Sequence, residues 1–367
     1  MIGASEGHSL FSFHPYLGYY GTPGFYPWGV NSVQYNQFGL TNSNGHGYPS
    51  KRSSDSFVIG ILGGSVAEIF ADQSEDFLQK FADDVANFNR DIKIINLAVA
   101  GYKQPQQLIQ LQNAILSGFE FDVVINIDGF NDLVLSVSNQ NIGVNPLYPS
   151  FQHFSEMASL SSPPSLLKIK HLNSYYENLS REMFYLELLQ DTFLFHSALA
   201  HLFEHQYSLF LKKSRREIAD KLSSNSQYNK SLFCGPSINL NDKDYCVRLW
   251  KSSSLMINQI CRINNIEYFH FLQPNQYIPG SKPLSDNEKK IAFNPSHPWG
   301  SIIAEKYQEL RVAGNSLRDF GIKFSDFSFI FRDVFEDIYV DDCCHFGLRG
   351  NEILSEFVSQ KIFEIYE

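Results

Sequence analysis

Two side chains far apart in the sequence have the chemistry of a nucleophile and its base. Ser65 ends a short apolar run, SFVIGILGGS, and His345 lies shortly before the last helical stretch of the chain. A serine hydroxyl attacks poorly until a base removes its proton. An unperturbed imidazole titrates at about pH 6.5, so His345 can act as that base near neutral pH. The two residues therefore predict nucleophilic catalysis through a covalent intermediate.

Three further residues fit the remaining parts of such a site. Asp342 precedes His345 by three positions and can accept the second imidazole N–H, which fixes the tautomer. Attack of a serine on a carbonyl group also builds an oxyanion, which needs preorganised donors. The predicted donors are the backbone N–H groups of Ser65 and Gly101 and the side-chain amide of Asn131. Gly101 suits this role because no side chain blocks the approach to its N–H.

Each of these residues also has an ordinary structural explanation. A serine that follows glycine and precedes a helix is a good N-cap, Asn131 and Asp132 form a typical turn pair, and Asp342 fits a solvated loop. What favours catalysis is their combination. The segments that contain Ser65, Gly101 and Asn131 each follow a strand-like run. Open parallel sheets bind ligands at the carboxyl ends of their strands.

The segments that carry these residues alternate between strand and helix patterns. Three apolar runs that end in glycine-containing turns predict buried parallel strands: SFVIGILGG, IKIINLAVAG and FDVVINIDGFND. Helical spacing follows the first run over residues 66–90, and QPQQLIQLQNAILSG is typical of a helix closed by Gly118. This alternation predicts parallel βαβ units.

The pattern changes after the third strand. Residues 135–240 predict a mostly helical insertion or lid, with one long helix near 181–222. The sequence then predicts, in chain order, a helix over 244–264, a fourth strand IEYFHFLQP, a helix over 298–320, a fifth short strand near 335–340 and a last helix from about 349. Residues 1–55, rich in Gly, Pro, Asn and aromatic residues, predict an irregular N-terminal arm.

The predicted fold class is therefore α/β. It is a three-layer α/β/α sandwich with a mainly parallel five-stranded sheet, a helical insertion and an irregular N-terminal arm. The predicted core comprises residues 56–134 and 241–367, with the arm over 1–55 and the insertion over 135–240.

The four chemical segments, in this order, resemble the blocks of the SGNH/GDSL hydrolase family. The serine turn is GGSVAE, the lone glycine lies in NLAVAGY, the third block is GFND, and the last, DCCH, spans Asp342 to His345. Gly64 stands where the family usually has aspartate. The resemblance covers about residues 56–132 and 334–366, and it implies a flavodoxin-like sheet and a serine esterase.

The resemblance implies cleavage of an ester through an acyl-enzyme, with an O-acylated carbohydrate or another small molecule as substrate. An O-acyltransferase that uses the same residues is the alternative. A non-catalytic binding module on the same fold is a third reading, disfavoured because every catalytic position is filled.

Composition excludes several classes of partner and cofactor. The formal net charge of −10 disfavours nucleic acid and anionic membranes, which need clustered Lys and Arg. No run of eighteen or more apolar residues predicts a membrane span. The start MIGASEGHSL shows no signal-peptide pattern. A mature protein from which such a peptide had been removed would look the same. A periplasmic or secreted location is favoured over a cytoplasmic one. GILGGS matches neither a dinucleotide nor a P-loop motif, so no cofactor is expected.

The cysteines and histidines predict no metal site. Cys234 and Cys246 bracket a turn-rich loop whose spacing suits a disulfide in an oxidising compartment, and two free thiols are the alternative. No CxxC pair appears, and His201 and His205 lack an obvious acidic third ligand. Cys343 and Cys344 share the loop of His345, so neither is expected to replace Ser65 as nucleophile.

Overall fold

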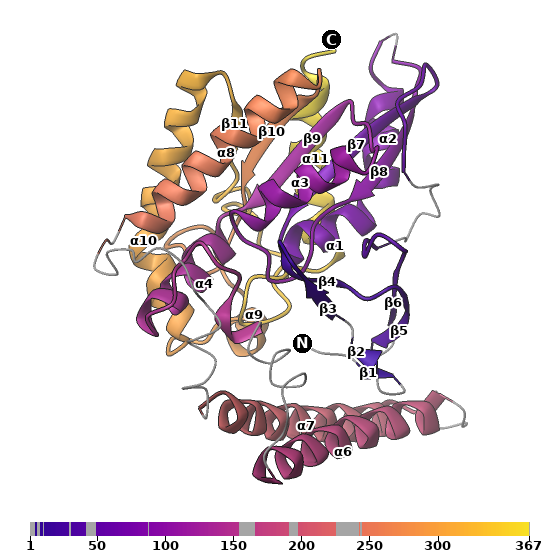
Figure 1. The fold of residues 1–367 in the computed structure, drawn as a ribbon, viewed down its shortest axis with the longest axis vertical. Coiled ribbons are helices and arrows are strands. Elements are labelled where there is room, and N and C mark those ends of the chain that lie inside the picture. Colours follow the sequence, from indigo (N-terminus) through magenta and orange to yellow (C-terminus); the bar gives the residue numbers. More distant parts are fainter. Residues whose placement is uncertain are drawn as a thin grey trace. The chain divides into compact units, whose positions relative to one another are not determined.

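The structure is a computed structural model that describes residues 4–5, 8–9, 11–28, 31–41, 49–86, 88–153, 166–190, 197–224, 242 and 244–366 (Figure 1). The chain divides into two compact units, Met1–Gly39 with Phe151–Pro236, and Leu40–Ser150 with Ser237–Glu367. Segments 40–55 and 135–150 thus belong with the sheet, although we expected them in the arm and the insertion.

The second unit is built on one parallel sheet. Its strands are β7 (Ser56–Gly63), β8 (Asp91–Asn96), β9 (Val123–Asp128), β10 (Glu267–Leu272) and β11 (Lys323–Asp326). Their order across the sheet is β11-β10-β9-β7-β8, and all four pairings are parallel. This is the flavodoxin-like order of a doubly wound sheet, in which the direction of winding reverses between the first and third strands. The predicted fold class is confirmed.

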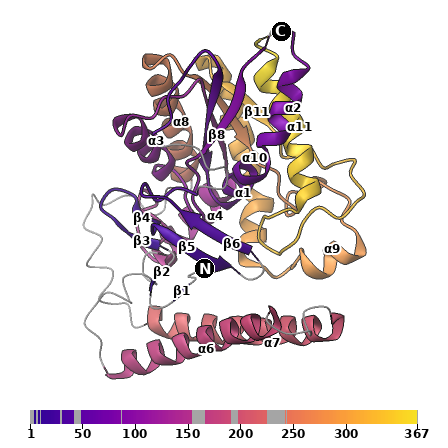
Figure 2. The same cartoon turned by 90° about the vertical axis from the view of Figure 1, so that its right-hand side faces the viewer.

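Helices cover both faces of this sheet. The helices of this unit are α1 (Ser65–Gln73), α2 (Glu75–Asp83), α3 (Gln106–Leu116), α4 (Phe130–Asn141), α8 (Tyr245–Ile263), α9 (Asp286–Ile291), α10 (Pro298–Leu317), the 3₁₀ turn η3 (Arg318–Phe320) and α11 (Leu348–Phe363). Helices α2 and α11 pack together on one face, and α3 packs against α8 on the other (Figure 2). Helix α10 packs against α8, α4 and β11.

The two central strands are hydrophobic because both of their faces are covered. Every residue of β7 and β9 is buried, as is typical of parallel strands between helical layers. At their carboxyl ends the chain turns sharply through Gly63 and Gly129, whose φ angles are +149° and +116°. A Cβ on Gly63 would lie 2.3 Å from the carbonyl oxygen of Ile127, so β7 can end beside β9 only with glycine there.

Two elements of this unit differ from the sequence prediction. The fifth strand is β11, not residues 335–340, which form only an isolated bridge between Tyr339 and Phe346. The short strand was missed because only four residues pair, directly after the left-handed Gly321 that ends η3. The GFND segment opens helix α4 rather than a loop, since Asp132 caps its own N-terminus.

The first unit contains short β-hairpins and a helical pair. Its strands pair antiparallel as β1 (Ala4–Ser5) with β2 (His8–Ser9), β3 (Phe11–His14) with β4 (Gly18–Gly21), and β5 (Gly24–Trp28) with β6 (Asn31–Tyr35). The arm is therefore more regular than expected. We predicted one long helix near 181–222, but the structure has α6 (Leu166–Gln190) and α7 (Ala198–Ser224), joined by the buried ion pair of Glu182 and Arg215. None of the helices described is both long and apolar enough to cross a membrane.

A buried carboxylate ties the sheet to helix α8. Asp128, the last residue of β9, accepts hydrogen bonds from the indole N–H of Trp250 at 2.6 Å and from Nε2 of His270 at 2.8 Å. Its other oxygen accepts from Asn126 at 2.9 Å, and Nδ1 of His270 lies 2.8 Å from the hydroxyl of Ser254. Buried polar groups are costly unless they are paired, so this network fixes how α8 packs on β9 and β10.

We predict that Asp128→Ala lowers the free energy of unfolding by roughly 3 kcal/mol or more, because the buried donors of Trp250, His270 and Asn126 lose their acceptor and each unpaired donor costs about 1–3 kcal/mol. Urea denaturation followed by circular dichroism measures the change. Asp91→Ala, at the exposed first residue of β8, is the control and should stay within about 0.5 kcal/mol of the parent. Equal stability of the two variants would show that the network is not stabilising.

Candidate active site

Ser65 lies where the central strand passes into its helix. It is the first residue of α1, and Gly64 occupies the N-cap position in an extended conformation with φ −97° and ψ −154°. The serine hydroxyl therefore does not cap the helix, and it lies 2.6 Å from Nε2 of His345. Since the first N–H groups of a helix have no acceptor within it, the backbone N–H of Ser65 points out of the helix end.

His345 reaches the serine from the loop before α11. Its Nδ1 lies 2.5 Å from Oδ2 of Asp341, and its side chain is 12% exposed. The other oxygen of Asp341 accepts the backbone N–H groups of Cys343 at 3.0 Å, Cys344 at 3.2 Å and His345 at 3.2 Å. One carboxylate thus folds the loop and orients the imidazole at the same time.

The structure corrects the predicted acid. Asp341, not Asp342, bonds the imidazole, although the family pattern aligned Asp342 with the aspartate of DxxH. The reason is the tight turn that the carboxylate of Asp341 itself makes with three following N–H groups. The backbone carbonyl of Asp342 instead accepts a hydrogen bond from the hydroxyl of Tyr277 at 2.8 Å.

The electrostatics of the pair favour a charged aspartate beside the histidine. Burial alone would lower the pKa of His345, but its hydrogen bond to Asp341 and the nearby carboxylate charge raise that pKa above its usual value. Burial would likewise raise the pKa of Asp341, and the bonds from His345 and the loop N–H groups outweigh it, so the pKa of this carboxyl is lowered. Asp341 is therefore ionised wherever His345 titrates.

Asn131 lies beside the serine turn, as the oxyanion prediction requires. Its side-chain amide donates to the carbonyl of Tyr102 at 2.9 Å. A Cβ on Gly64 would lie 2.2 Å from the same amide nitrogen. An amide carries two N–H groups, and the structure shows the partner of one of them, the carbonyl of Tyr102. Glycine at position 64, where the family usually has aspartate, gives this amide the room it occupies.

The turn that contains Gly101 is linked to the start of helix α4 by a buried carboxylate. Gly101 has a φ of +79° in the turn that follows β8. Asp132 accepts the backbone N–H of Gln104 at 2.7 Å and that of Gly129 at 3.2 Å. Burial raises the pKa of Asp132. Gly101 and Asn131, two of the three predicted oxyanion donors, thus lie on segments that Asp132 joins.

Three consecutive side chains after β10 hold the histidine loop by its carbonyl groups. Gln276 donates to the carbonyl of Asp341 at 3.0 Å, and Tyr277 to that of Asp342. Asn275 donates to the carbonyl of Cys343 at 3.4 Å. Sequence analysis found none of these anchors and did not assign Asp341. The signal was present in the segment QPNQY, whose polar residues follow directly on a predicted buried strand.

Among known proteins, the chain is similar to solved structures of low sequence identity. No protein-family model matches it, and no curated protein matches it. It is similar to the solved structure of a GDSL-like lipase from Bacteroides thetaiotaomicron VPI-5482, with 9% identity, 84% of this chain and 88% of that chain covered, and a TM-score of 0.37.

Two esterase structures are similar to a comparable degree. The acetylxylan esterase Axe2 from Geobacillus stearothermophilus has 10% identity, 84% of this chain and 94% of that chain covered, and a TM-score of 0.40. The acetyl xylan esterase AlAXEase has 12% identity, 84% and 99% coverage, and a TM-score of 0.38. At such distance we derive the function from the geometry of the site.

The neighbouring aspartates allow a matched test of the acid. We predict that Asp341→Asn lowers kcat/KM on the order of 10⁴-fold, as loss of the triad aspartate does. It should also move the acidic limb of the pH–rate profile to lower pH, because the carboxylate raises the pKa of His345 and burial, which remains, lowers it.

Asp342→Asn is the control, since only its backbone carbonyl is held in the loop. This variant should keep both the rate and the acidic limb of the parent. A larger loss in Asp342→Asn than in Asp341→Asn would restore the assignment made from the sequence.

Proposed function

We propose that the protein is a serine hydrolase that cleaves an ester through an acyl-enzyme, with Ser65 as nucleophile, His345 as general base and Asp341 as its orienting acid. The observation that carries the proposal is the continuous chain from Ser65 Oγ to His345 Nε2 at 2.6 Å and from Nδ1 to Asp341 at 2.5 Å. A nucleophile, a base and a group that orients the base, all within hydrogen-bond reach, are the signature of activated serine.

In the first half-reaction His345 takes the proton of the Ser65 hydroxyl, and Oγ adds to the ester carbonyl. The resulting oxyanion is held by the amide of Asn131 and the backbone N–H groups of Ser65 and Gly101. When the tetrahedral intermediate collapses, His345 donates its proton to the departing alcohol. Asp341 stabilises the imidazolium formed between these steps and is not itself protonated.

In the second half-reaction water replaces the alcohol. His345 takes a proton from the water, the hydroxide adds to the acyl carbonyl of Ser65, and the same donors hold the second oxyanion. Collapse releases the carboxylic acid and returns the proton to Ser65 Oγ. The proposed substrate is an O-acylated carbohydrate or another small ester, because the resemblance of the four sequence blocks to the SGNH/GDSL hydrolase family implies it. The role of the insertion as a lid also stays a prediction.

The direct test replaces the nucleophile. Ser65→Ala should leave less than a tenth of the wild-type turnover of a chromogenic acetyl ester, because loss of a serine nucleophile costs orders of magnitude. Unchanged circular dichroism would show that the fold is kept. The assay is run with and without a sugar acceptor, since a rate that depends on the acceptor would indicate an acyltransferase. Activity of Ser65→Ala above a tenth of the wild-type value would exclude the serine mechanism.

The oxyanion role of Asn131 has a second, independent probe in Gly64. Asn131→Ala should lower kcat by roughly 10²–10³ with a smaller effect on KM. Gly64→Ala keeps an allowed φ of −97°, but its Cβ would displace the amide of Asn131. It should therefore lower kcat as well, and the double variant should be little worse than Asn131→Ala alone, because the two changes remove one interaction. Additive losses, or a change in KM alone, would contradict this role.

A further inference from the structure

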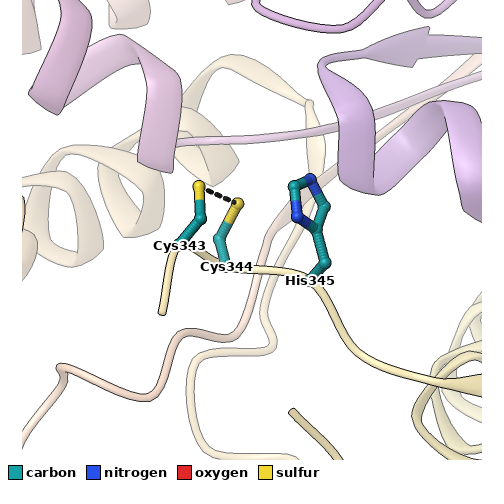
Figure 3. Close-up of side chains that lie close together, drawn as sticks. All are labelled: Cys343, Cys344 and His345. Atoms are coloured by element: carbon teal, nitrogen blue, oxygen red, sulfur yellow. Dashed lines mark hydrogen bonds between the residues drawn. The ribbon is translucent and has the colours of Figure 1, made fainter. Parts of the chain in front are cut away.

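Two thiols and the catalytic imidazole converge in the loop before α11. The Sγ atoms of Cys343 and Cys344 are 3.4 Å apart, and both lie with a ring nitrogen of His345 in a group whose ligand atoms are all within 4.8 Å of one another. Figure 3 shows the two sulfur atoms on the same side of the loop, next to the imidazole. Within the parts of the chain that the structure describes, this is the group of side chains with the spacing of metal ligands.

The donor set has the chemistry of a zinc site. Cysteine sulfur binds Zn²⁺ at about 2.3 Å and histidine nitrogen at about 2.0–2.1 Å. In a tetrahedral complex, two sulfur ligands at that distance lie about 3.8 Å from each other. The two thiols are already 3.4 Å apart, so a small outward movement brings both to one ion. Thiolate and imidazole together select Zn²⁺ over Mg²⁺ or Ca²⁺, which prefer oxygen ligands.

The loop is held in this arrangement before any ligand arrives. The backbone N–H groups of both cysteines donate to Asp341, and the carbonyl of Cys343 accepts from Asn275. A binding group that is fixed in advance loses little conformational freedom when it binds. The site lacks the CxxC spacing that is typical of zinc ligands, because here the side chains of two consecutive residues point the same way.

We propose that Cys343, Cys344 and His345 form an inhibitory binding site for Zn²⁺ or a similarly thiophilic divalent cation. The two thiols release their protons to solvent on binding, and a water completes the tetrahedral coordination. The metal site stands on geometry alone, whereas the inhibition rests on the proposed function, because it requires His345 to be the base.

Inhibition follows from the two hydrogen bonds of the imidazole. One ring nitrogen lies against Ser65 and the other against Asp341, so each is already committed to the triad. Coordination through either nitrogen breaks one of these bonds. The bound cation also prevents the ring from taking the serine proton, which is the step that activates the nucleophile.

Metal binding is measured first, without any substrate. Purified protein, reduced with a phosphine and freed of metal with a chelator, is titrated with Co²⁺ as a spectroscopic substitute and then with Zn²⁺. We expect one ion per chain, a thiolate-to-cobalt charge-transfer band, and displacement of Co²⁺ by Zn²⁺. Cys343→Ser and Cys344→Ser should each weaken binding by at least about 100-fold, since even changes around a metal ligand cost 10–100-fold. Cys261→Ala, a buried cysteine of α8, is the control and should bind as wild type does.

Turnover of the acetyl ester is measured next, with and without Zn²⁺. Cys343→Ser and Cys344→Ser should keep most of the metal-free activity, because neither thiol belongs to the catalytic machinery. Zn²⁺ should inhibit wild type and Cys261→Ala at one equivalent, and an added chelator should restore the rate. The two serine variants should need at least about 100-fold more Zn²⁺ for the same inhibition.

The outcomes separate this proposal from the proposed function. Absence of the thiolate band, or equal Zn²⁺ inhibition of wild type and both serine variants, overturns the metal site. Binding at the thiols with no loss of turnover overturns the inhibition. If the metal-free wild type does not hydrolyse esters, the proposed function fails, while the cobalt spectrum still reports whether the site exists.

Discussion

The parallel pairing of β7 with β9 is the constraint on which the candidate site depends. It places the carboxyl ends of two strands side by side at the point where the sheet reverses its winding, which is where doubly wound folds bind ligands. Ser65 follows the first strand and Asn131 the second, so their proximity results from the sheet rather than from their own contacts. Gly63 makes this pairing possible, because any side chain there would strike the carbonyl of Ile127.

The histidine loop depends on a different principle, because no strand delivers it. Its carbonyl groups accept hydrogen bonds from Gln276 and Tyr277, which follow β10. The segment that leads into the loop is held by Glu288. Glu288 is fully buried, pairs with Lys282 at 2.6 Å, and accepts the backbone N–H groups of Ile338 at 2.8 Å and Tyr339 at 3.0 Å. A buried charge persists only when it is paired and hydrogen-bonded, so this cluster commits the chain to one path toward His345.

The sheet and the placement of Ser65 were predictable because both follow from the order of short apolar runs and glycine-containing turns along the chain. Continuous apolar runs ending in glycine identify buried parallel strands, and the residue after the first run must lie at the strand end. Asp341 was not predictable in this way, since Asp341 and Asp342 are neighbours of the same type and only the turn decides which one faces the ring. Strand β11 was missed for a related reason, because four paired residues carry too little pattern to distinguish them from a loop.

The uneven exposure of the proposed catalytic groups sets how the candidate site responds to its surroundings. Asp341 has a side chain 40% exposed, whereas that of His345 is 12% exposed. A partly solvated carboxylate keeps its charge at little cost, and that charge acts on an imidazole that burial would otherwise keep neutral. The loop can therefore make the histidine a stronger base without burying an unpaired charge. The same openness leaves Cys343 half-buried beside the ring, so the feature that activates the base also admits a competing ligand to it.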